Sequence, residues 1–273
     1  MAIREILLDV GGTFVKCSDG RSVPINSNGS REEIISSLRA AFGDASAAAV
    51  AIPGPFNYDE GIFLMKHKFA AVYGEKFSDI VCPEGRFRFI HDVNAMLLGE
   101  MTSGAGAGFG RVALVTLGTG LGFSMSIDGQ IIKNENGSPR VSIFNRTYKD
   151  GVLEDYASKR GVLAAYAAES GAPTGELTAK RIADMAFAGD DAANRAFLRV
   201  GRIIGETISP ILGEYGIECL LFGGQISRSF ELLRPSLEDA FEDLGALRFI
   251  GPVSDINNAT FNGLKALLAA ENK

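Results

Sequence analysis

The sequence lacks several features that mark well-known protein classes. Its three cysteines, Cys17, Cys82 and Cys219, are odd in number, far apart and form no C-x-x-C pair. They predict reduced thiols in a cytosolic chain rather than a disulfide framework or a zinc site. No apolar run approaches the length that spans a membrane, and no basic-then-apolar leader opens the chain. We therefore expect a cytoplasmic protein without membrane contact.

An excess of basic residues is also missing. The chain has 27 Lys and Arg against 33 Asp and Glu, which gives a formal charge of −6. This acidic balance argues against general electrostatic binding of nucleic acid. No Gly-Lys dipeptide occurs, so a Walker-type loop is excluded. Neither absence excludes an anionic small molecule, because oriented N–H groups and one metal ion can hold phosphate locally.

What the chain does have is enough length and apolar content for two lobes. Its 273 residues exceed the usual single-domain size, and 46% hydrophobic with 22% charged residues describes an ordinary globular protein. A glycine-alanine linker over 103–110 is a candidate boundary. We expect a small α/β lobe over 1–110 and a larger α/β lobe over 111–257. A C-terminal helix, 258–273, is expected to pack back on the first lobe.

The first candidate site is a strand that ends in glycines. An apolar run reaches Asp9 and is followed after one residue by Gly11, Gly12 and Thr13. Glycines let a ligand approach the main chain closely, and Asp9 could hold a hydrated Mg²⁺. Thr13 adds a hydroxyl, and Lys16 adds a positive charge. A plain β-hairpin turn also explains the pair of glycines, and the two interpretations are compatible.

A predicted strand followed by glycines occurs twice more in the chain. The strand predicted over 112–117 is followed by a second glycine hairpin. The strand predicted over 217–222 is followed by a glycine junction that leads into a helix. The residues are Gly118, Thr119 and Gly120 in the hairpin, and Gly223, Gly224 and Gln225 at the junction. Close packing of strand on helix is the alternative for the junction. A G-x-G-x-x-A match at 108–113 precedes a strand instead of following one, so it is not a dinucleotide site.

An aspartate lies where a predicted strand meets a predicted helix. The alternating segment 86–90 runs directly into His91 and Asp92, ahead of a helix over 95–100. A helix N-cap favours aspartate at this place. Ligand-facing residues of α/β sheets also lie at strand ends. Both interpretations of Asp92 stay open from the residues alone.

Helix signals complete the pattern. Ser30 and Glu33 form a capping box before a helix predicted to end at about Phe42, and the segment 47–52 reads as a buried strand. Beyond Leu153 the chain reads mainly as helices, predicted over 154–169, 177–188 and 190–215. The sequence therefore predicts an α/β protein.

The order of these motifs resembles the actin/hexokinase superfamily and, within it, the ROK family of bacterial sugar kinases and sugar-responsive repressors. The likeness runs nearly end to end. Its most specific pieces are Asp9-Val10-Gly11-Gly12-Thr13, His91-Asp92-Val93-Asn94-Ala95, Leu117-Gly118-Thr119-Gly120-Leu121-Gly122 and Leu221-Phe222-Gly223-Gly224-Gln225-Ile226-Ser227. The resemblance implies a two-lobed actin/hexokinase-like (ribonuclease H-like) α/β fold with an interdomain cleft.

The resemblance also implies ATP-dependent phosphorylation of a hexose or related sugar. Asp92 would be the general base, and ATP with Mg²⁺ the cofactors. The phosphate- and Mg²⁺-binding residues it implies are Asp9, Gly11, Gly12, Thr13, Lys16, Gly118, Thr119 and Gly120. Those implied for adenosine are Gly223, Gly224 and Gln225, and those for the sugar are His91, Glu154 and His67. Dimers are common in the family, so a homodimer is one expectation.

Three departures from the family pattern stand out. Family members usually carry a Glu-x-Gly-His segment and a cysteine-rich zinc knuckle, but the corresponding stretch 141–151 has neither His nor Cys, so no zinc is expected. His91 stands where the family usually has Asn. The sugar-facing loop carries Lys66, His67 and Lys68 instead of an asparagine-bearing sequence. The motifs implied for nucleotide binding therefore match the family pattern, whereas those implied for sugar binding differ from it.

Two other function classes compete with the kinase. ROK repressors carry a helix-turn-helix ahead of the first phosphate motif, but only eight residues precede Asp9 here, so we do not expect a DNA-binding module. A sugar or nucleotide sensor with weak or no kinase activity is the other alternative, because the sugar loops are changed. The residue pattern does not name the sugar or the hydroxyl that is phosphorylated.

Overall fold

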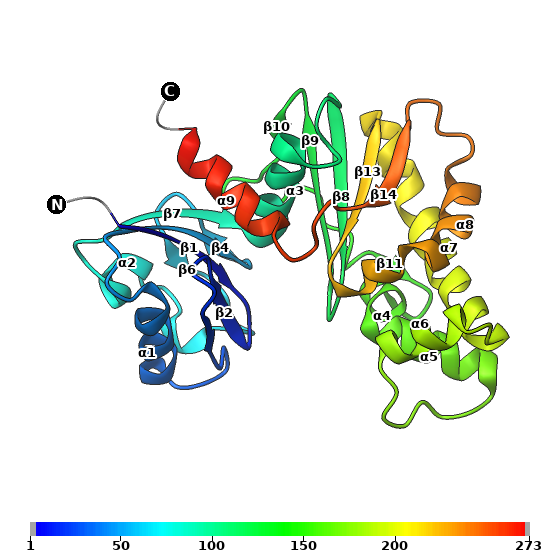
Figure 1. Cartoon of the computed structure of the whole chain (residues 1–273), viewed down its shortest axis with the longest axis horizontal. Coiled ribbons are helices and arrows are strands. Elements are labelled where there is room, and N and C mark those ends of the chain that lie inside the picture. Colours follow the sequence, from blue (N-terminus) through cyan, green and yellow to red (C-terminus); the bar gives the residue numbers. More distant parts are fainter. Residues whose placement is uncertain (1–3, 271–273) are drawn as a thin grey trace. The chain divides into compact units, whose positions relative to one another are not determined.

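The computed structural model describes residues 4–270, and the chain divides into two compact units (Figure 1). The first unit runs to Ala107 and also takes in Ile131–Arg140 and the chain from Asn257 onward. The second unit comprises Gly108–Gln130 and Val141–Ile256. The chain therefore crosses between the units more than once.

The first unit is built on a five-stranded sheet of order β3-β2-β1-β4-β7. Its strands are β1 (Glu5–Val10), β2 (Phe14–Cys17), β3 (Ser22–Pro24), β4 (Ala47–Ile52) and β7 (Arg86–His91). β1, β2 and β3 pair antiparallel, whereas β1, β4 and β7 run parallel. A small separate pair consists of β5 (Phe56–Asn57) and β6 (Ile62–Phe63). The glycine stretch is thus the hairpin between β1 and β2.

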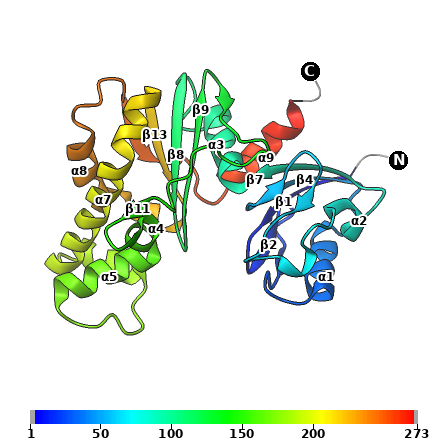
Figure 2. The same cartoon turned by 180° about the vertical axis from the view of Figure 1, so that it is seen from behind.

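Both faces of this sheet are covered, as the apolar run in β1 predicts for a central strand. Ile6, Leu8 and Val10 belong to a core with α1 (Arg31–Phe42), whereas Leu7 packs with residues of α3 (Asp92–Ser103) and α9 (Ala259–Ala269). Figures 1 and 2 show α1 on one side of the sheet and α3 with α9 on the other. Since side chains alternate along a strand, Asp9 shares its face with Leu7.

Short local signals account for the helix ends in this unit. Ser30 is the N-cap of α1, and its side chain and that of Glu33 make the reciprocal capping-box bonds, so that prediction is confirmed. The remaining helices here are η1 (Ala70–Val72) and α2 (Phe77–Val81). α9 approaches α3 at glycines: a Cβ on Gly263 would overlap the carbonyl of Ala95. The end of the chain therefore packs tightly on α3.

The second unit repeats the sheet order with different helices. Its sheet, β10-β9-β8-β13-β14, has the antiparallel hairpin β8–β9 at its centre, and β8, β13 and β14 run parallel. The strands are β8 (Arg111–Leu117), β9 (Leu121–Ile127), β10 (Gln130–Ile131), β13 (Cys219–Gly223) and β14 (Phe249–Pro252), with a small pair β11 (Thr147–Tyr148) and β12 (Gly151–Val152). In both units a glycine hairpin follows the central strand.

One helix prediction for this unit was wrong. The segment predicted as one helix over 154–169 is two, α4 (Leu153–Ala157) and α5 (Lys159–Ser170), because the buried Ser158 between them is extended. The other helices are α6 (Ala179–Phe187), α7 (Asp191–Tyr215), η2 (Gln225–Ser229) and α8 (Phe230–Phe241). Asp190 caps α7 by accepting the Ala193 N–H at 2.8 Å, which confirms the predicted start. Among residues 4–270, no helix combines the length and apolarity needed to cross a membrane.

Candidate active site

The parallel strands of the first unit bring three segments to one edge. Asp9 lies opposite Ala51 in the register of β1 with β4, and Ile52 lies opposite His91 in the register of β4 with β7. Parallel strands present their carboxyl ends at the same edge, where α/β sheets place ligands. The end of β1, the Pro53-Gly54-Pro55 loop and the start of α3 therefore meet there.

The first glycine hairpin has N–H groups available for a ligand. Gly11 N–H donates to the Phe14 carbonyl at 2.9 Å, and the carbonyls of Gly12 and Thr13 accept from Ser27 and Ile25. Within residues 4–270, no turn or loop carbonyl accepts the N–H of Gly12 or Thr13. Successive free amides of this kind form a concavity that suits phosphate oxygens.

The junction of β7 and α3 places Asp92 beside His91. The N-cap of α3 is His91, and Asp92 is the first helical residue, so Asp92 does not have the N-cap position that one interpretation of the sequence gave it. His91 Nδ1 lies 2.9 Å from Asp92 Oδ1, and the same oxygen accepts the Val93 N–H at 2.8 Å. The Asp92 side chain keeps 39% of its surface exposed, against 16% for His91. One carboxylate oxygen is therefore held while the group stays open to solvent.

The charges around these carboxylates push their two pKa values in opposite directions. Desolvation opposes ionisation of Asp92, but the charge and hydrogen bond of His91, then the Val93 N–H and the Lys68 charge, hold the pKa of Asp92 below its ordinary value. Desolvation and the negative charge of Asp92 raise the pKa of Asp9 to about 6, against the opposing charge of Lys16. At neutral pH Asp92 is thus ionised.

The Asp9 carboxylate suits a magnesium ion. Lys16 Nζ lies 3.9 Å from Asp9 Oδ2, and a divalent cation would relieve the repulsion between Asp9 and Asp92 more effectively. Mg²⁺ is usually held by one or two carboxylates together with water and substrate phosphates. Within residues 4–270, no group of three or more His, Cys, Asp or Glu side chains is arranged to hold a metal. A single strand-end carboxylate such as Asp9 is a ligand that Mg²⁺ uses together with water and phosphate oxygens.

Two residues that the sequence did not single out, Tyr58 and Ser138, lie near the loop that precedes the site. The ring of Tyr58 lies 5.9 Å from the His91 ring, and its hydroxyl donates to the Ile52 carbonyl at 2.8 Å. A Cβ on Gly54 would come within 3.0 Å of Ser138 Oγ and 3.4 Å of His91 Cδ2. Ser138 belongs to the segment that returns to the first unit, and no local sequence signal connects it with His91.

The second glycine hairpin is held by a carboxylate of its own unit. Gly118 N–H donates to the Gly120 carbonyl at 3.0 Å, and the Gly118 carbonyl accepts the Lys159 N–H at 2.9 Å. Glu154 Oε2 accepts the Leu121 N–H at 2.9 Å. A Cβ on Gly120 would lie 2.8 Å from that oxygen. The structure thus places Glu154, for which the sequence predicts a sugar contact, against the hairpin backbone.

Glu154 also has a cationic partner. Arg160 lies 3.3 Å from Glu154 Oε1 and 3.1 Å from Asp155 Oδ1. The exposed Thr119 lies at the tip of the hairpin. Charge beside this hairpin is therefore largely neutralised within its own unit.

At the glycine junction after β13, the backbone of Gly224 packs closely against the backbone at the end of β8. Gly224 has φ 82°, and a Cβ there would overlap the Leu117 carbonyl at the end of β8. Ser227 Oγ donates to the Gly224 carbonyl at 2.7 Å, and Gln225 Oε1 accepts from Arg228. Close packing thus explains Gly224, and adenosine binding by Gly223, Gly224 and Gln225 stays a prediction.

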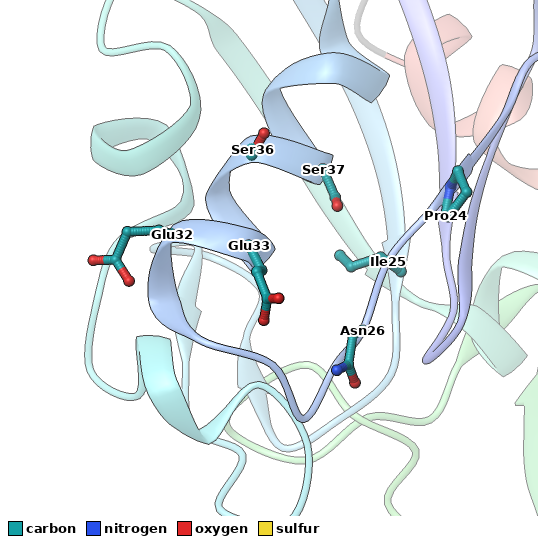
Figure 3. Close-up of a pocket in the computed structure, with 7 residues that line it drawn as sticks. All are labelled: Pro24, Ile25, Asn26, Glu32, Glu33, Ser36 and Ser37. Carbon is teal, nitrogen blue, oxygen red and sulfur yellow. The ribbon is translucent and has the colours of Figure 1, made fainter.

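A surface hollow of about 610 Å³ lies beside the first hairpin, between α1 and the chain that follows β3 (Figure 3). It is lined by Pro24, Ile25, Asn26, Glu32, Glu33, Ser36 and Ser37. Ile25 connects it to the hairpin by donating its N–H to the Thr13 carbonyl at 2.9 Å. Asp9 and Asp92 do not line this hollow.

Comparison with known proteins places this arrangement in a family. The sequence matches the model of the ROK family over residues 30–141 and 146–270. The chain belongs to the ROK family. A glucokinase from Halalkalibacterium halodurans is 29% identical over 175 residues, which cover 56% of this chain and 52% of that protein. The first curated relatives are thus matched over about half of their own length.

Two further proteins are similar over most of this chain. The DNA-binding transcriptional dual regulator NagC of Escherichia coli is 25% identical over 262 residues, covering 86% of this chain and 63% of the regulator. A ROK family glucokinase from Streptomyces griseus, crystallised with glucose and AMPPNP, matches with a TM-score of 0.78 at 20% identity, covering 97% of this chain and 98% of that one. The structural likeness confirms the predicted actin/hexokinase-like α/β fold.

Proposed function

We propose that this ROK protein transfers the γ-phosphoryl group of ATP to a hydroxyl of a hexose or related sugar, with Asp92 as the general base. The observation that carries the proposal is the Asp92 carboxylate itself. It is partly exposed, held by His91 at 2.9 Å, and lies in the same unit as Asp9 and the first glycine hairpin. A group that only satisfied backbone amides of the helix would need neither the exposure nor the histidine partner.

In phosphoryl transfer the protein itself forms no covalent bond to the substrates in most enzymes of this kind. The reaction requires that the reacting groups be positioned, that phosphate charge be shielded, and that a proton be accepted from the attacking hydroxyl. A low pKa keeps Asp92 ionised, and the sugar hydroxyl loses its proton as its bond to phosphorus forms. His91 keeps one oxygen of Asp92 occupied, which leaves the other for the sugar.

The remaining residues have supporting roles in this proposal. Mg²⁺, when bound, shields the phosphate charge, and Asp9 would orient it. The hairpin residues that would hold phosphate are Gly11, Gly12, Thr13, Gly118, Thr119 and Gly120, and those that would carry adenosine are Gly223, Gly224 and Gln225. His67 is exposed and would contact the sugar. Glu154 would do so only as a further acceptor, because both of its oxygens already have partners.

The test measures ADP release over a panel of hexoses, amino sugars and polyols. We expect turnover on at least one sugar, and a loss of about 10²- to 10⁴-fold in Asp92→Asn, the usual contribution of a general base. ATP binding should persist in that variant. Asp191→Asn is the matched control, because Asp191 is likewise the first residue of a helix and should leave turnover unchanged.

A nucleotide or sugar sensor is the second candidate. It is favoured by the match to NagC and by the Lys66-His67-Lys68 sequence of the sugar-facing loop. Binding of ATP without turnover on any sugar of the panel would support the sensor and refute the kinase.

A further inference from the structure

Lys68 lies in a loop that is tied to the first glycine hairpin through one buried serine. Ser27, only 4% exposed, donates its N–H to the Gly12 carbonyl at 3.1 Å and accepts the Phe69 N–H at 2.6 Å. Both bonds are between backbone groups, so they fix the chain at Phe69 relative to the hairpin. The residue before Phe69 is therefore positioned by the hairpin itself.

The loop is anchored on both sides of its exposed residues. Met65 and Phe69 are fully buried, and the Phe69 ring packs 5.7 Å from the Phe63 ring. Phe69 has φ 53°, a left-handed conformation that a bulky side chain adopts only where the surroundings impose it. Backbone strain of this kind is concentrated at functional sites. The exposed Lys68 thus projects from a rigid support.

The Lys68 side chain extends over the hairpin. A Cβ built on Gly12 would lie 3.9 Å from Lys68 Cε and 4.0 Å from its Nζ. The ammonium group is also close enough to Asp92 to lower the pKa of that carboxyl. No carboxylate among residues 4–270 lies within ion-pair distance of Lys68. The ammonium therefore faces the glycine hairpin and the proposed base without a close ion pair to a described carboxylate.

The neighbouring cations are engaged elsewhere. Lys66 Nζ lies over the Tyr73 ring, 5.3 Å from its centroid, and Lys16 pairs with Asp9. Of the lysines near the hairpin, Lys68 is thus the one whose charge is available to a ligand.

We propose that Lys68 is a further catalytic residue, whose ammonium group contacts the phosphoryl group in transfer between the first glycine hairpin and Asp92. This inference rests on the proposed kinase function. The sugar oxygen forms the new bond to phosphorus while its proton passes to Asp92. The bond from phosphorus to the bridging oxygen breaks, and ADP leaves with the electron pair. Lys68 remains protonated throughout and stabilises the negative charge on the equatorial oxygens.

The experiment compares Lys68→Ala, Lys68→Arg and the matched control Lys66→Ala, which removes a lysine from the same loop. We expect Lys68→Ala to lose about 10²- to 10³-fold in kcat, the usual effect of removing one transition-state donor, with the sugar KM nearly unchanged. Lys68→Arg should recover most of this loss, because the charge is kept. Lys66→Ala should behave as the wild type, and unfolding curves should show all three variants folded.

A binding measurement separates failure of this inference from failure of the proposed function. Lys68→Ala should bind ATP more weakly than the wild type but ADP equally well, because ADP lacks only the γ-phosphate. Turnover by the wild type with unchanged kcat in Lys68→Ala would overturn the role of Lys68 and leave the kinase standing. A raised sugar KM with normal kcat would overturn it too, since Lys68 would then contact the sugar. If the wild type turns over no sugar, the proposed kinase function fails. In that case, equal affinity of the wild type and Lys68→Ala for ATP would also refute the contact between Lys68 and the phosphate.

Discussion

Replacing Gly118 by alanine separates the functional use of a glycine from its structural use. A Cβ on Gly118 would meet no atom within 4 Å, and the backbone there is not in the left-handed region. Alanine at such a site restricts the unfolded chain and stabilises a protein by about 0.4–1 kcal/mol. We therefore expect the free energy of unfolding of Gly118→Ala to equal or exceed that of the wild type.

Nucleotide binding should change in the opposite direction. If the open space beside Gly118 is where a phosphate lies, the added methyl group would displace it from the hairpin amides. Loss of one hydrogen bond to a charged group costs about 1.5–3 kcal/mol. At 1.4 kcal/mol for each factor of ten, the Kd for ATP should rise about 10- to 150-fold. A variant that is more stable yet binds ATP worse would identify a glycine kept for its ligand.

Urea unfolding and titration calorimetry with MgATP measure the two effects. Gly245→Ala is the control, because a Cβ on Gly245 also meets nothing within 4 Å and the residue belongs to no predicted site. It should show the same small stabilisation with unchanged ATP affinity. Wild-type affinity in Gly118→Ala would refute the phosphate role of this hairpin, and a loss of stability would refute the steric reasoning.

Two further variants test the first unit. In His91→Ala the pKa of Asp92 should rise toward its ordinary value, because the charge and hydrogen bond that lower it are gone. Protonation then inactivates the base sooner as pH falls, so the acid limb of the kcat/KM profile should move to higher pH. An unmoved limb would show that Asp92 does not set it. In Leu264→Ala the free energy of unfolding should fall by about 2–5 kcal/mol, because Leu264 is fully buried with Leu7, Ala49 and Ala95. Urea unfolding measures this change. An effect below about 1 kcal/mol would mean that α9 contributes little to this core.

The parts of the fold that sequence predicts well are those decided by neighbouring residues. The capping box of Ser30 and Glu33 requires only three residues of separation, and the helix begins where it predicts. The all-apolar segment Ala47–Ile52 forms the strand β4, buried along its length. Both glycine hairpins follow from a strand, a glycine turn and a returning strand.

The parts that sequence missed depend on residues distant in the chain. Ser158 interrupts a segment of good helix formers, and next to it Lys159 N–H donates to the Gly118 carbonyl. That bond links positions about forty residues apart, so local propensity carries no sign of it. Ser138 approaches Gly54 from an irregular segment, and Lys68 lies beside Gly12 because Ser27 joins the neighbouring Phe69 to the hairpin. The polar surroundings of the site therefore came from the structure.

The two units have the same sheet order but different chemistry at their hairpins. Asp9 stands two residues before Gly11, whereas Thr116 stands two residues before Gly118, so the second hairpin lacks the strand-end carboxylate. Its nearest carboxylate, Glu154, is occupied by the Leu121 N–H and Arg160. The first unit instead holds a carboxylate of raised pKa beside one of lowered pKa. Under the proposed function, the residues that accept the proton and orient Mg²⁺, Asp92 and Asp9, both lie in the first unit. We therefore expect substitutions at the second hairpin to weaken nucleotide binding, whereas those at Asp92 and Lys68 should slow the chemical step.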